Sequence, residues 1–167
     1  MALKDFEQKI KISEDLVKEV KCDYLREISS DDCQLLFEWV NDSEVRKNSF
    51  SREPIPYETH VLWFQKKLED SGCEIFIYMD GNEPVGQVRV DFEEDAGLIS
   101  YFIAKEFRGK GYGKKMLLAI ETKIAERVGV LNAQVKKDNK ASQLVFERLG
   151  YQRMEKEDMV SYKKYLV

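Results

Sequence analysis

The chain has 167 residues, of which 43% are hydrophobic and 35% are charged, a composition typical of one compact domain rather than a disordered segment. Its apolar runs are too short for a transmembrane helix, so we expect no membrane partner. The formal net charge of −4 argues against general nucleic-acid binding, which needs a basic surface.

The N-terminal residues 1–21 alternate charged residues with isolated apolar ones and are expected to form an extension that precedes the domain. They lack the apolar stretch of a secretory signal, which predicts a cytoplasmic protein. Three cysteines, Cys22, Cys33 and Cys73, form no C-x-x-C pair, which predicts reduced thiols rather than a disulfide framework or a zinc site. Residues 22–167 are predicted to form a single domain, which acts as a monomer or a homodimer.

The first half of this domain is predicted to hold a strand and two helices. A short strand at Tyr24–Ile28 precedes a helix over Asp31–Val40. The polar segment Asn41–Pro56, which holds two prolines, is predicted to be a loop. A second helix over Tyr57–Asp70 is expected to turn a stripe of apolar residues inward: Val61, Phe64 and Leu68.

Three strands follow, at Glu74–Met79, Val85–Phe92 and Leu98–Ala104. The turn signal Asp80-Gly81-Asn82 separates the first two. The second strand alternates, so its two faces are expected to carry different residues: Val88, Val90 and Phe92 on one, and Gln87, Arg89 and Asp91 on the other.

The last third combines two helices with three strands. A helix from about Gly113 to Val128 is expected to bury Met116, Leu117, Ile120, Ile124 and Val128. After a strand at Val130–Val135, a helix over Asn139–Leu149 is expected to bury Ala141, Leu144, Val145 and Leu149, and Gly150 ends it. Strands near Tyr151–Glu155 and Met159–Leu166 form a closing hairpin. The order of elements predicts a mixed α/β fold with a crossover through the helix after residue 113.

The strongest chemical signal is the glycine-rich segment Arg108-Gly109-Lys110-Gly111-Tyr112-Gly113-Lys114, which follows a strand and opens a helix. Three glycines in five residues allow positive φ angles and a close approach of the backbone to a ligand. Successive N–H groups at a helix start form a concavity that binds phosphate oxygens. Five basic residues against one acid lie between Lys105 and Lys115. The segment therefore predicts an anion site.

Other glycine loops fit this segment less well. A Walker loop needs G-x-x-x-x-G-K-[ST], which the sequence lacks, and a dinucleotide fingerprint needs G-x-G-x-x-G, whereas the spacing here is G-x-G-x-G. A glycine-rich turn that merely joins a strand to a helix is the remaining alternative.

The chain resembles the GNAT superfamily of N-acetyltransferases. Arg108-x-x-Gly111-x-Gly113 matches the coenzyme A motif [QR]-x-x-G-x-[GA] of that family. Downstream, Asn139-Lys140-Ala141-Ser142 and Leu149-Gly150-Tyr151 match its N-x-x-[AS] and L-G-[FY] motifs, and the resemblance covers roughly residues 24–165. It implies a central mixed, largely antiparallel sheet of about six or seven strands, flanked by about four helices.

The resemblance implies that acetyl-CoA is the coenzyme. It implies that the diphosphate is contacted by the glycine-rich loop: Arg108, Gly109, Lys110, Gly111, Tyr112, Gly113 and Lys114. It also implies contacts along the pantetheine from Phe102, Ile103, Asn139, Ser142 and Phe146. Main-chain amides would bind the diphosphate, and the backbone of the preceding strand would pair with the pantetheine. Asn139 is equally expected to be a helix N-cap.

By the same resemblance, a neutral amine attacks the thioester directly, so the enzyme must manage two protons. Asp91, Glu93, Glu94 and His60 are the candidate bases, with solvated or core side chains as the alternative reading for each. The family's usual general acid is a tyrosine at the position of Phe146, so Tyr101, Tyr151 or water is expected to replace it.

The segments around Trp39 and His60 resemble the sugar-nucleotide N-acetyltransferases of the pseudaminic-acid type, which acetylate an amine on a UDP-linked sugar. More loosely, they resemble the ribosomal-protein N-terminal acetyltransferases. The candidate acceptor contacts are Arg46, Asn48, His60, Trp63 and Arg89; for the tryptophans, the alternative is a place in the core. Other readings are acetylation of another small amine or of an antibiotic, and a non-catalytic acyl-CoA sensor.

Overall fold

The computed structural model describes residues 22–166, so the extension predicted over residues 1–21 lies outside the described residues. Within them, one sheet contains seven strands: β1 (Asp23–Glu27), β2 (Cys73–Asp80), β3 (Glu83–Glu93), β4 (Ala96–Ile103), β5 (Val130–Lys136), β6 (Gln152–Glu155) and β7 (Met159–Tyr165). Their order is β1-β2-β3-β4-β5-β7-β6. All neighbours are antiparallel except β4 and β5, which are parallel. The predicted mixed, largely antiparallel sheet is confirmed.

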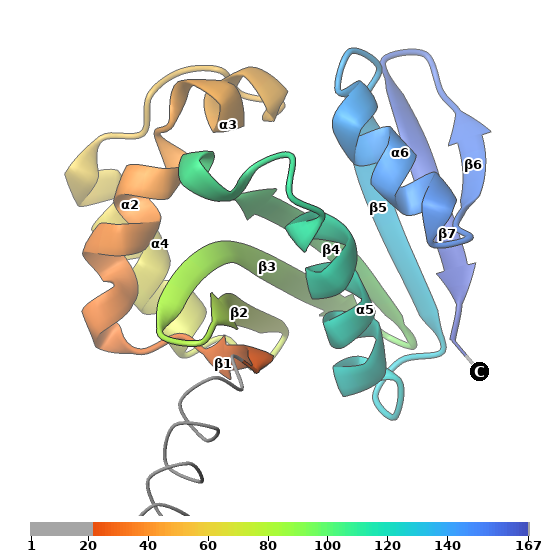
Figure 1. Cartoon of the computed structure of the whole chain (residues 1–167). Helices are drawn as coiled ribbons and strands as arrows, with labels where there is room; N and C mark the ends of the chain where they lie inside the picture. Colours follow the sequence, from red (N-terminus) through yellow and green to blue (C-terminus); the bar gives the residue numbers. More distant parts are fainter. Residues whose placement is uncertain (1–21, 167) are drawn as a thin grey trace, which may run out of the picture.

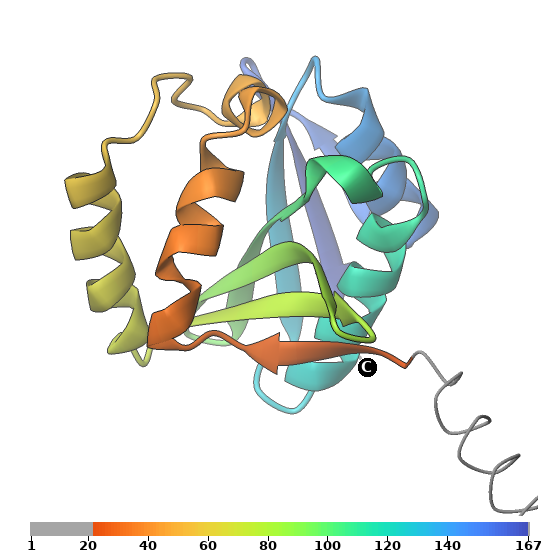
Figure 2. The same ribbon diagram turned by 60° about the vertical axis from the view of Figure 1, so that its left-hand side comes forward.

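Helices cover both faces of this sheet (Figures 1 and 2). They are α2 (Cys33–Val40), α3 (Ser43–Asn48), α4 (Tyr57–Leu68), α5 (Tyr112–Ile124) and α6 (Lys140–Arg148), with short 3-10 turns η1 (Ser30–Asp32) and η2 (Lys105–Phe107). One face carries α2 and α4, and the other carries α5 and α6. Among residues 22–166, no helix has the length and apolar character that a membrane crossing needs.

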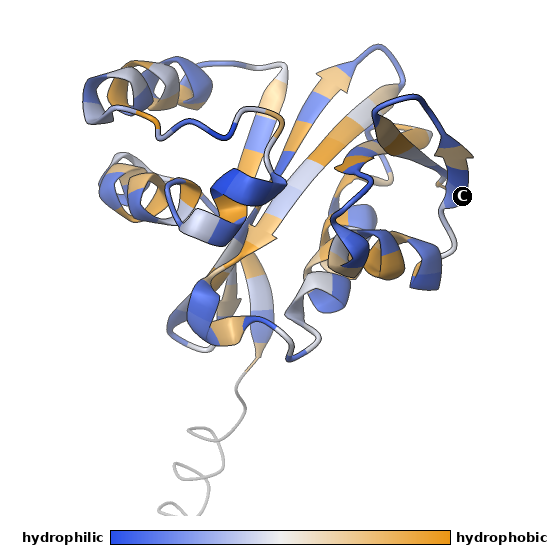
Figure 3. Ribbon diagram, turned by 90° about the horizontal axis from the view of Figure 1, so that it is seen from above, coloured by the Kyte–Doolittle hydropathy of each residue, from blue (hydrophilic) through white to orange (hydrophobic). Residues whose placement is uncertain are grey.

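The alternation of side chains along the strands divides the core between these two faces. On β2, Phe76 and Tyr78 belong to the cluster under α5 and α6, whereas Ile75 and Ile77 belong to the cluster under α2 and α4. Apolar residues accordingly lie along the strands and on the inner sides of the helices, with hydrophilic residues in the loops (Figure 3).

The alternation predicted for β3 is confirmed. Val88 and Val90 are fully buried in the cluster under α5 and α6. On the opposite face, Arg89 and Asp91 contact two residues of α4. Arg89 lies near the ring of Trp63, and Asp91 forms an ion pair with Lys67. The polar residues of this strand therefore point toward α4 rather than simply into solvent.

The segment predicted as a loop, Asn41–Pro56, contains the helix α3. Asp42 caps it, because its Oδ1 accepts hydrogen bonds from the N–H groups of Glu44 (3.1 Å) and Val45 (3.3 Å). The sequence of this short helix shows no apolar stripe, because none of the residues of α3 is buried.

The structure corrects the predicted inner faces of two helices and confirms a third. On α4, His60 and Phe64 are buried, whereas Leu68 is 40% exposed. On α6, Gln143 and Phe146 are buried, whereas Ala141 is exposed and Leu144 is 45% exposed. Leu149, the C-cap of α6, is buried as predicted. The polar Gln143 is tolerated inside because its Nε2 donates to the carbonyl oxygens of Lys136 and Lys137. The residues predicted for the inner face of α5 are all buried: Met116, Leu117, Ile120, Ile124 and Val128. The helix itself ends at Ile124, before the predicted end near Val128, so Val128 packs from the segment that follows it.

His60 joins α4 to α2. Its side chain is buried, and Nε2 lies 3.0 Å from the carbonyl oxygen of Cys33, so this nitrogen carries the hydrogen in the neutral ring. The ring stacks on Phe64 and contacts Phe37 and Trp63. Burial lowers the pKa of His60 below its usual 6.5, although the bond to Cys33 opposes this.

This lowered pKa predicts a pH dependence of stability that is easy to assign, because His60 is the single histidine of the chain. Below about pH 6.5 the unfolded chain takes up a proton that the folded chain does not, so the free energy of unfolding falls as the pH falls. We expect urea midpoints to drop between pH 7.5 and 5.5 in the wild type and to drop less in His60→Gln. An equal drop in both proteins would show that His60 is not held neutral.

Candidate active site

The site begins where β4 and β5 separate. The two strands pair only from Ala96 to Ile99 on β4 and from Val130 to Ala133 on β5. Beyond this point, β4 keeps its partner β3 through Ile103, but no strand formed by residues 22–166 pairs with its other side. A cavity of about 1400 Å³ fills the gap and is lined by residues from both faces of the sheet. Backbone groups of Ser100–Ile103 that point away from β3 therefore form an open strand edge beside a cavity.

The glycine-rich loop borders this cavity at the end of β4. Gly109 and Gly111 have φ angles of 73° and 82°, and Gly111 is the N-cap of α5. A Cβ at either glycine would meet no other atom within 4 Å. Among residues 22–166, the backbone N–H groups of Gly109 to Lys114 donate no hydrogen bond. Six consecutive unsatisfied donors at a helix N-terminus, beside a cavity, fit the diphosphate of a coenzyme.

Several side chains hold this loop in place. Nε of Arg108 donates to the carbonyl oxygen of Ile103 (3.0 Å), and its Nη2 donates to Oδ1 of Asp42 (2.5 Å). The hydroxyl of Tyr112 donates to Asp80, at the end of β2. Lys110 folds back onto the carbonyl oxygen of Glu106 (2.8 Å). Positive charge remains for a ligand at Lys114, which lines the cavity.

The wall of the cavity on the α6 side was only partly predicted. Asn139 is the N-cap of α6, as predicted, with its Oδ1 accepting from the N–H of Ser142 (3.2 Å). It also lines the cavity, where its contact with the pantetheine stays a prediction. The hydroxyl of Ser142 donates to the hydroxyl oxygen of Tyr101 (3.1 Å). Burial raises the pKa of Tyr101, more than the bond from Ser142 lowers it, so the phenol is protonated at neutral pH.

Phe146 packs in an aromatic cluster deep on this wall. It is 2% exposed, stacks on Tyr162 and meets Tyr101 and Tyr151 edge to face. Tyr151 is not among the lining residues of the cavity, whereas Tyr101 is. Of the two tyrosines predicted to replace the missing one, Tyr101 is therefore the one in reach of the cavity.

The other side of the cavity is closed by α3, which connects the two separated strands. At its start, Asp42 binds Arg108 of the glycine loop; at its end, Nζ of Lys136 on β5 donates to the carbonyl oxygen of Lys47 (2.8 Å). Arg52, just after α3, forms an ion pair with Asp138 (3.7 Å). This tether also keeps α3 against the end of β5.

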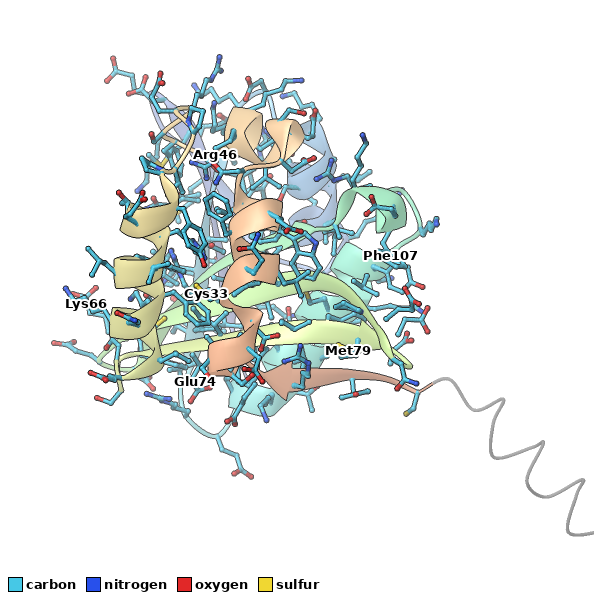
Figure 4. All side chains as sticks on the ribbon, turned by 90° about the vertical axis from the view of Figure 1, so that its left-hand side faces the viewer. Cys33, Arg46, Lys66, Glu74, Met79 and Phe107 are labelled. Atoms are coloured by element: carbon cyan, nitrogen blue, oxygen red, sulfur yellow. The ribbon has the colours of Figure 1, made fainter. Side chains whose placement is uncertain are left out.

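Arg46, predicted to contact the acceptor, lines the cavity, but its guanidinium is engaged in hydrogen bonds within the protein. Its guanidinium donates to the carbonyl oxygens of Val40, Ser51 and Glu53 and to the hydroxyl of Ser49. It therefore lies inside the loop between α3 and α4, as Figure 4 shows. The other predicted acceptor contacts, Asn48, His60, Trp63 and Arg89, line the cavity.

Two predicted bases lie elsewhere. Asp91 is not part of the cavity wall and binds Lys67 (2.9 Å) and Arg89 (2.8 Å). Burial disfavours its ionisation, but these cations outweigh burial and lower the pKa of Asp91. Glu93 lines a separate depression of about 480 Å³, together with Asp91. Neither carboxylate lines the large cavity, so the structure does not bring these two predicted bases together with the other predicted site residues.

Two residues that shape the site, Asp42 and Lys136, were not predicted from the sequence. Lys136 gave no signal, because its partners are backbone oxygens distant in the chain. Asp42 could have been found, since Asp42-Ser43-Glu44 is a common start of a helix.

Comparisons with known proteins show the family of this chain. The family model "Acetyltransferase (GNAT) domain" matches residues 24–152. A curated relative, the uncharacterized N-acetyltransferase YfmK of Bacillus subtilis (strain 168), is 28% identical over 94 residues, or 53% of this chain. The match spans 61% of the relative's length.

Solved structures share the fold at low identity. A spermidine N-acetyltransferase from Vibrio cholerae, in complex with CoA and spermine, superposes with a TM-score of 0.79 at 15% identity, over 86% of this chain and 95% of that one. An acetyltransferase from Salmonella typhimurium that modifies the N-terminal serine of ribosomal protein L7/L12 gives 0.74 at 18% identity, over 86% and 94%. The chain belongs to the acetyltransferase (GNAT) domain family, whose coenzyme is acetyl-CoA.

Proposed function

We propose that the chain transfers the acetyl group of acetyl-CoA to a primary amine by direct attack of the amine on the thioester. The observation that carries this proposal is the row of free N–H groups at Gly109–Lys114, next to the open edge of β4. The first feature suits a diphosphate and the second suits an extended amide chain, and a coenzyme A molecule carries both.

In this proposal the backbone of Gly109–Lys114 binds the diphosphate, while Phe102 and Ile103 pair with the pantetheine. Arg108 acts mainly through Asp42 and Ile103, so it positions the loop rather than neutralising a phosphate. Asn139, Ser142 and Phe146 form the wall along the pantetheine. The two sides of the cavity thus belong to β4 and β5, the strands that separate after Ile99 and Ala133.

Two protons must move as the C–N bond forms and the C–S bond breaks. We assign the proton for the leaving thiolate to Tyr101, whose protonated hydroxyl lies on the cavity wall. We assign acceptance of the amine's proton to Nδ1 of His60, directly or through water. His60 is neutral, Nε2 is used by Cys33, and Nδ1 has no hydrogen-bond partner among residues 22–166.

For the acceptor, we propose an amino group on a nucleotide-linked sugar. Trp63 offers a ring for stacking, and Asn48, Gln87 and Arg89 offer polar contacts along the same side of the cavity. A protein N-terminus is the alternative within the same chemistry. A non-catalytic acyl-CoA sensor is a second candidate, because Phe146 takes the place of the family's usual acid.

The acceptor proposal predicts a mass gain of one acetyl group when the enzyme is incubated with acetyl-CoA and a UDP-linked 4-amino-4,6-dideoxy sugar. Mass spectrometry of the sugar and release of CoA measure the same event. Acetylation of an N-terminal peptide but of no sugar would favour the alternative. Binding of acetyl-CoA without turnover of any amine would favour the sensor.

Tyr101→Phe should lower kcat by about 100-fold, because a positioned general acid contributes at least that much, and should leave KM for acetyl-CoA nearly unchanged. Ser142→Ala is the matched control: it removes the hydrogen-bond partner of the phenol but keeps the phenol. We expect a much smaller loss of kcat there. Equal rates for Tyr101→Phe and the wild type would assign the proton to water.

Gly111→Asp should raise the Kd for acetyl-CoA by about 100-fold, since a carboxylate among the free N–H groups repels a diphosphate by about 3 kcal/mol. Gly150→Asp is the control, because Gly150 has a similar φ of 80° and equally open surroundings but follows α6, outside the cavity. Both variants should lose similar thermal stability. Calorimetry showing equal affinity in the two variants would contradict the proposed diphosphate site.

A further inference from the structure

Arg89 lies on the acceptor side of the cavity, on the face of the sheet that α4 covers. It stands on β3 opposite Ser100 of β4, and its guanidinium carbon is 5.9 Å from the centre of the Trp63 ring. Its side chain is 28% exposed and lines the cavity. The guanidinium is therefore fixed on a wall that an acceptor would touch.

The contacts of Arg89 use one edge of the guanidinium and leave the other edge free. Nε lies 2.8 Å from Oδ2 of Asp91, an ion-pair contact without good hydrogen-bond alignment. Nη1 and Nη2 donate no hydrogen bond to any of residues 22–166. Paired N–H donors of this kind match the two oxygens of a carboxylate or a phosphate.

Asp91 connects Arg89 to a second cation. Its Oδ1 accepts from Lys67 at 2.9 Å, and Lys67 also binds Asp70 at 3.0 Å. These two cations and two carboxylates form a cluster that is neutral overall and holds Arg89 by the Nε edge. Arg89 therefore offers a group in the cavity the free N–H donors of its Nη atoms rather than a net positive charge.

Carboxylates that could attract a cationic acceptor are already engaged. The cavity wall carries Glu44 and Asp138, and these lie 3.6 Å from Lys47 and 3.7 Å from Arg52, respectively. Among residues 22–166, the carboxylates on this wall are thus paired with cations, and the Nη donors of Arg89 are free. An acceptor with several positive charges would meet these donors rather than free acids.

We propose that Arg89 binds an anionic group of the acceptor, so that the enzyme selects amines bearing a phosphate or carboxylate over polycationic amines. This inference rests on the proposed function, since it names the chemical class of that function's acceptor. It departs from the Vibrio cholerae neighbour, whose structure holds spermine.

Matched amines that differ in one charge test this selection. Glucosamine 6-phosphate is compared with glucosamine, β-alanine with β-alaninamide, and spermidine serves as the polycation. In the wild type we expect kcat/KM to be about 10-fold or more higher for the anionic member of at least one pair, the size expected for a charged hydrogen-bonded contact. If only the phosphate pair shows this preference, the anionic group that the enzyme selects is a phosphate; if only the carboxylate pair shows it, the group is a carboxylate.

Variants of Arg89 link the preference to the residue. In Arg89→Gln, the kcat/KM values for the anionic and the neutral amine of the pair should differ by no more than about threefold. Arg89→Lys should restore part of the preference for the anionic amine. Arg153→Gln is the control, because Arg153 is a surface arginine that binds Glu147 and Glu155 away from the cavity. This control should keep the wild-type ratio.

A binding measurement separates this inference from the proposed function. Calorimetric titration of the enzyme–CoA complex with each amine measures affinity even when no amine is acetylated. Tighter binding of the anionic member in the wild type, lost in Arg89→Gln, supports the inference whether or not turnover occurs. A preference for the neutral amine or for spermidine, or the same ratio in wild type and Arg89→Gln, overturns it.

Discussion

The structure depends on the separation of β4 from β5 after four paired residues. A strand edge inside a protein normally finds a partner, since unpaired backbone groups that lose water are costly. Here the edge of β4 continues to Ile103 without one, and the chain then turns into the N-terminus of α5 with its donors still free. Both sets of groups open onto the same cavity. A coenzyme with a diphosphate and an amide-containing arm can satisfy both at once.

Keeping two neighbouring strands apart requires support from elsewhere in the chain. On one face α3 bridges the gap, tied to the glycine loop through Asp42 and Arg108 and to β5 through Lys136. On the other face, the ring of Phe146 packs between Tyr101 of β4 and Tyr162 of β7. Contacts within the protein thus hold β4 and β5 apart, which reduces the conformational ordering of the protein that ligand binding requires.

Local patterns were sufficient to predict the strands, the glycine loop and the inner face of α5. Strand alternation in Gln87–Phe92 and the apolar spacing in Met116–Val128 each depend on neighbours in the sequence, so the sequence shows them directly. The face of α4 could not be predicted in this way, because His60 turns inward to meet the carbonyl oxygen of Cys33 on another helix. The hydrogen bonds of Arg46 could not be predicted for a related reason: its partners are mainly main-chain oxygens, which have no signature in the sequence.

The central claim is that the amides of Gly109–Lys114 are free in the protein alone and bound when acetyl-CoA is present. Hydrogen–deuterium exchange with and without acetyl-CoA measures this directly, peptide by peptide. The account predicts fast exchange across residues 109–114 without the coenzyme and strong protection with it, while the helix end near Gly150 is unchanged. Slow exchange of this loop in the free protein, or no protection at saturating acetyl-CoA, would contradict the account.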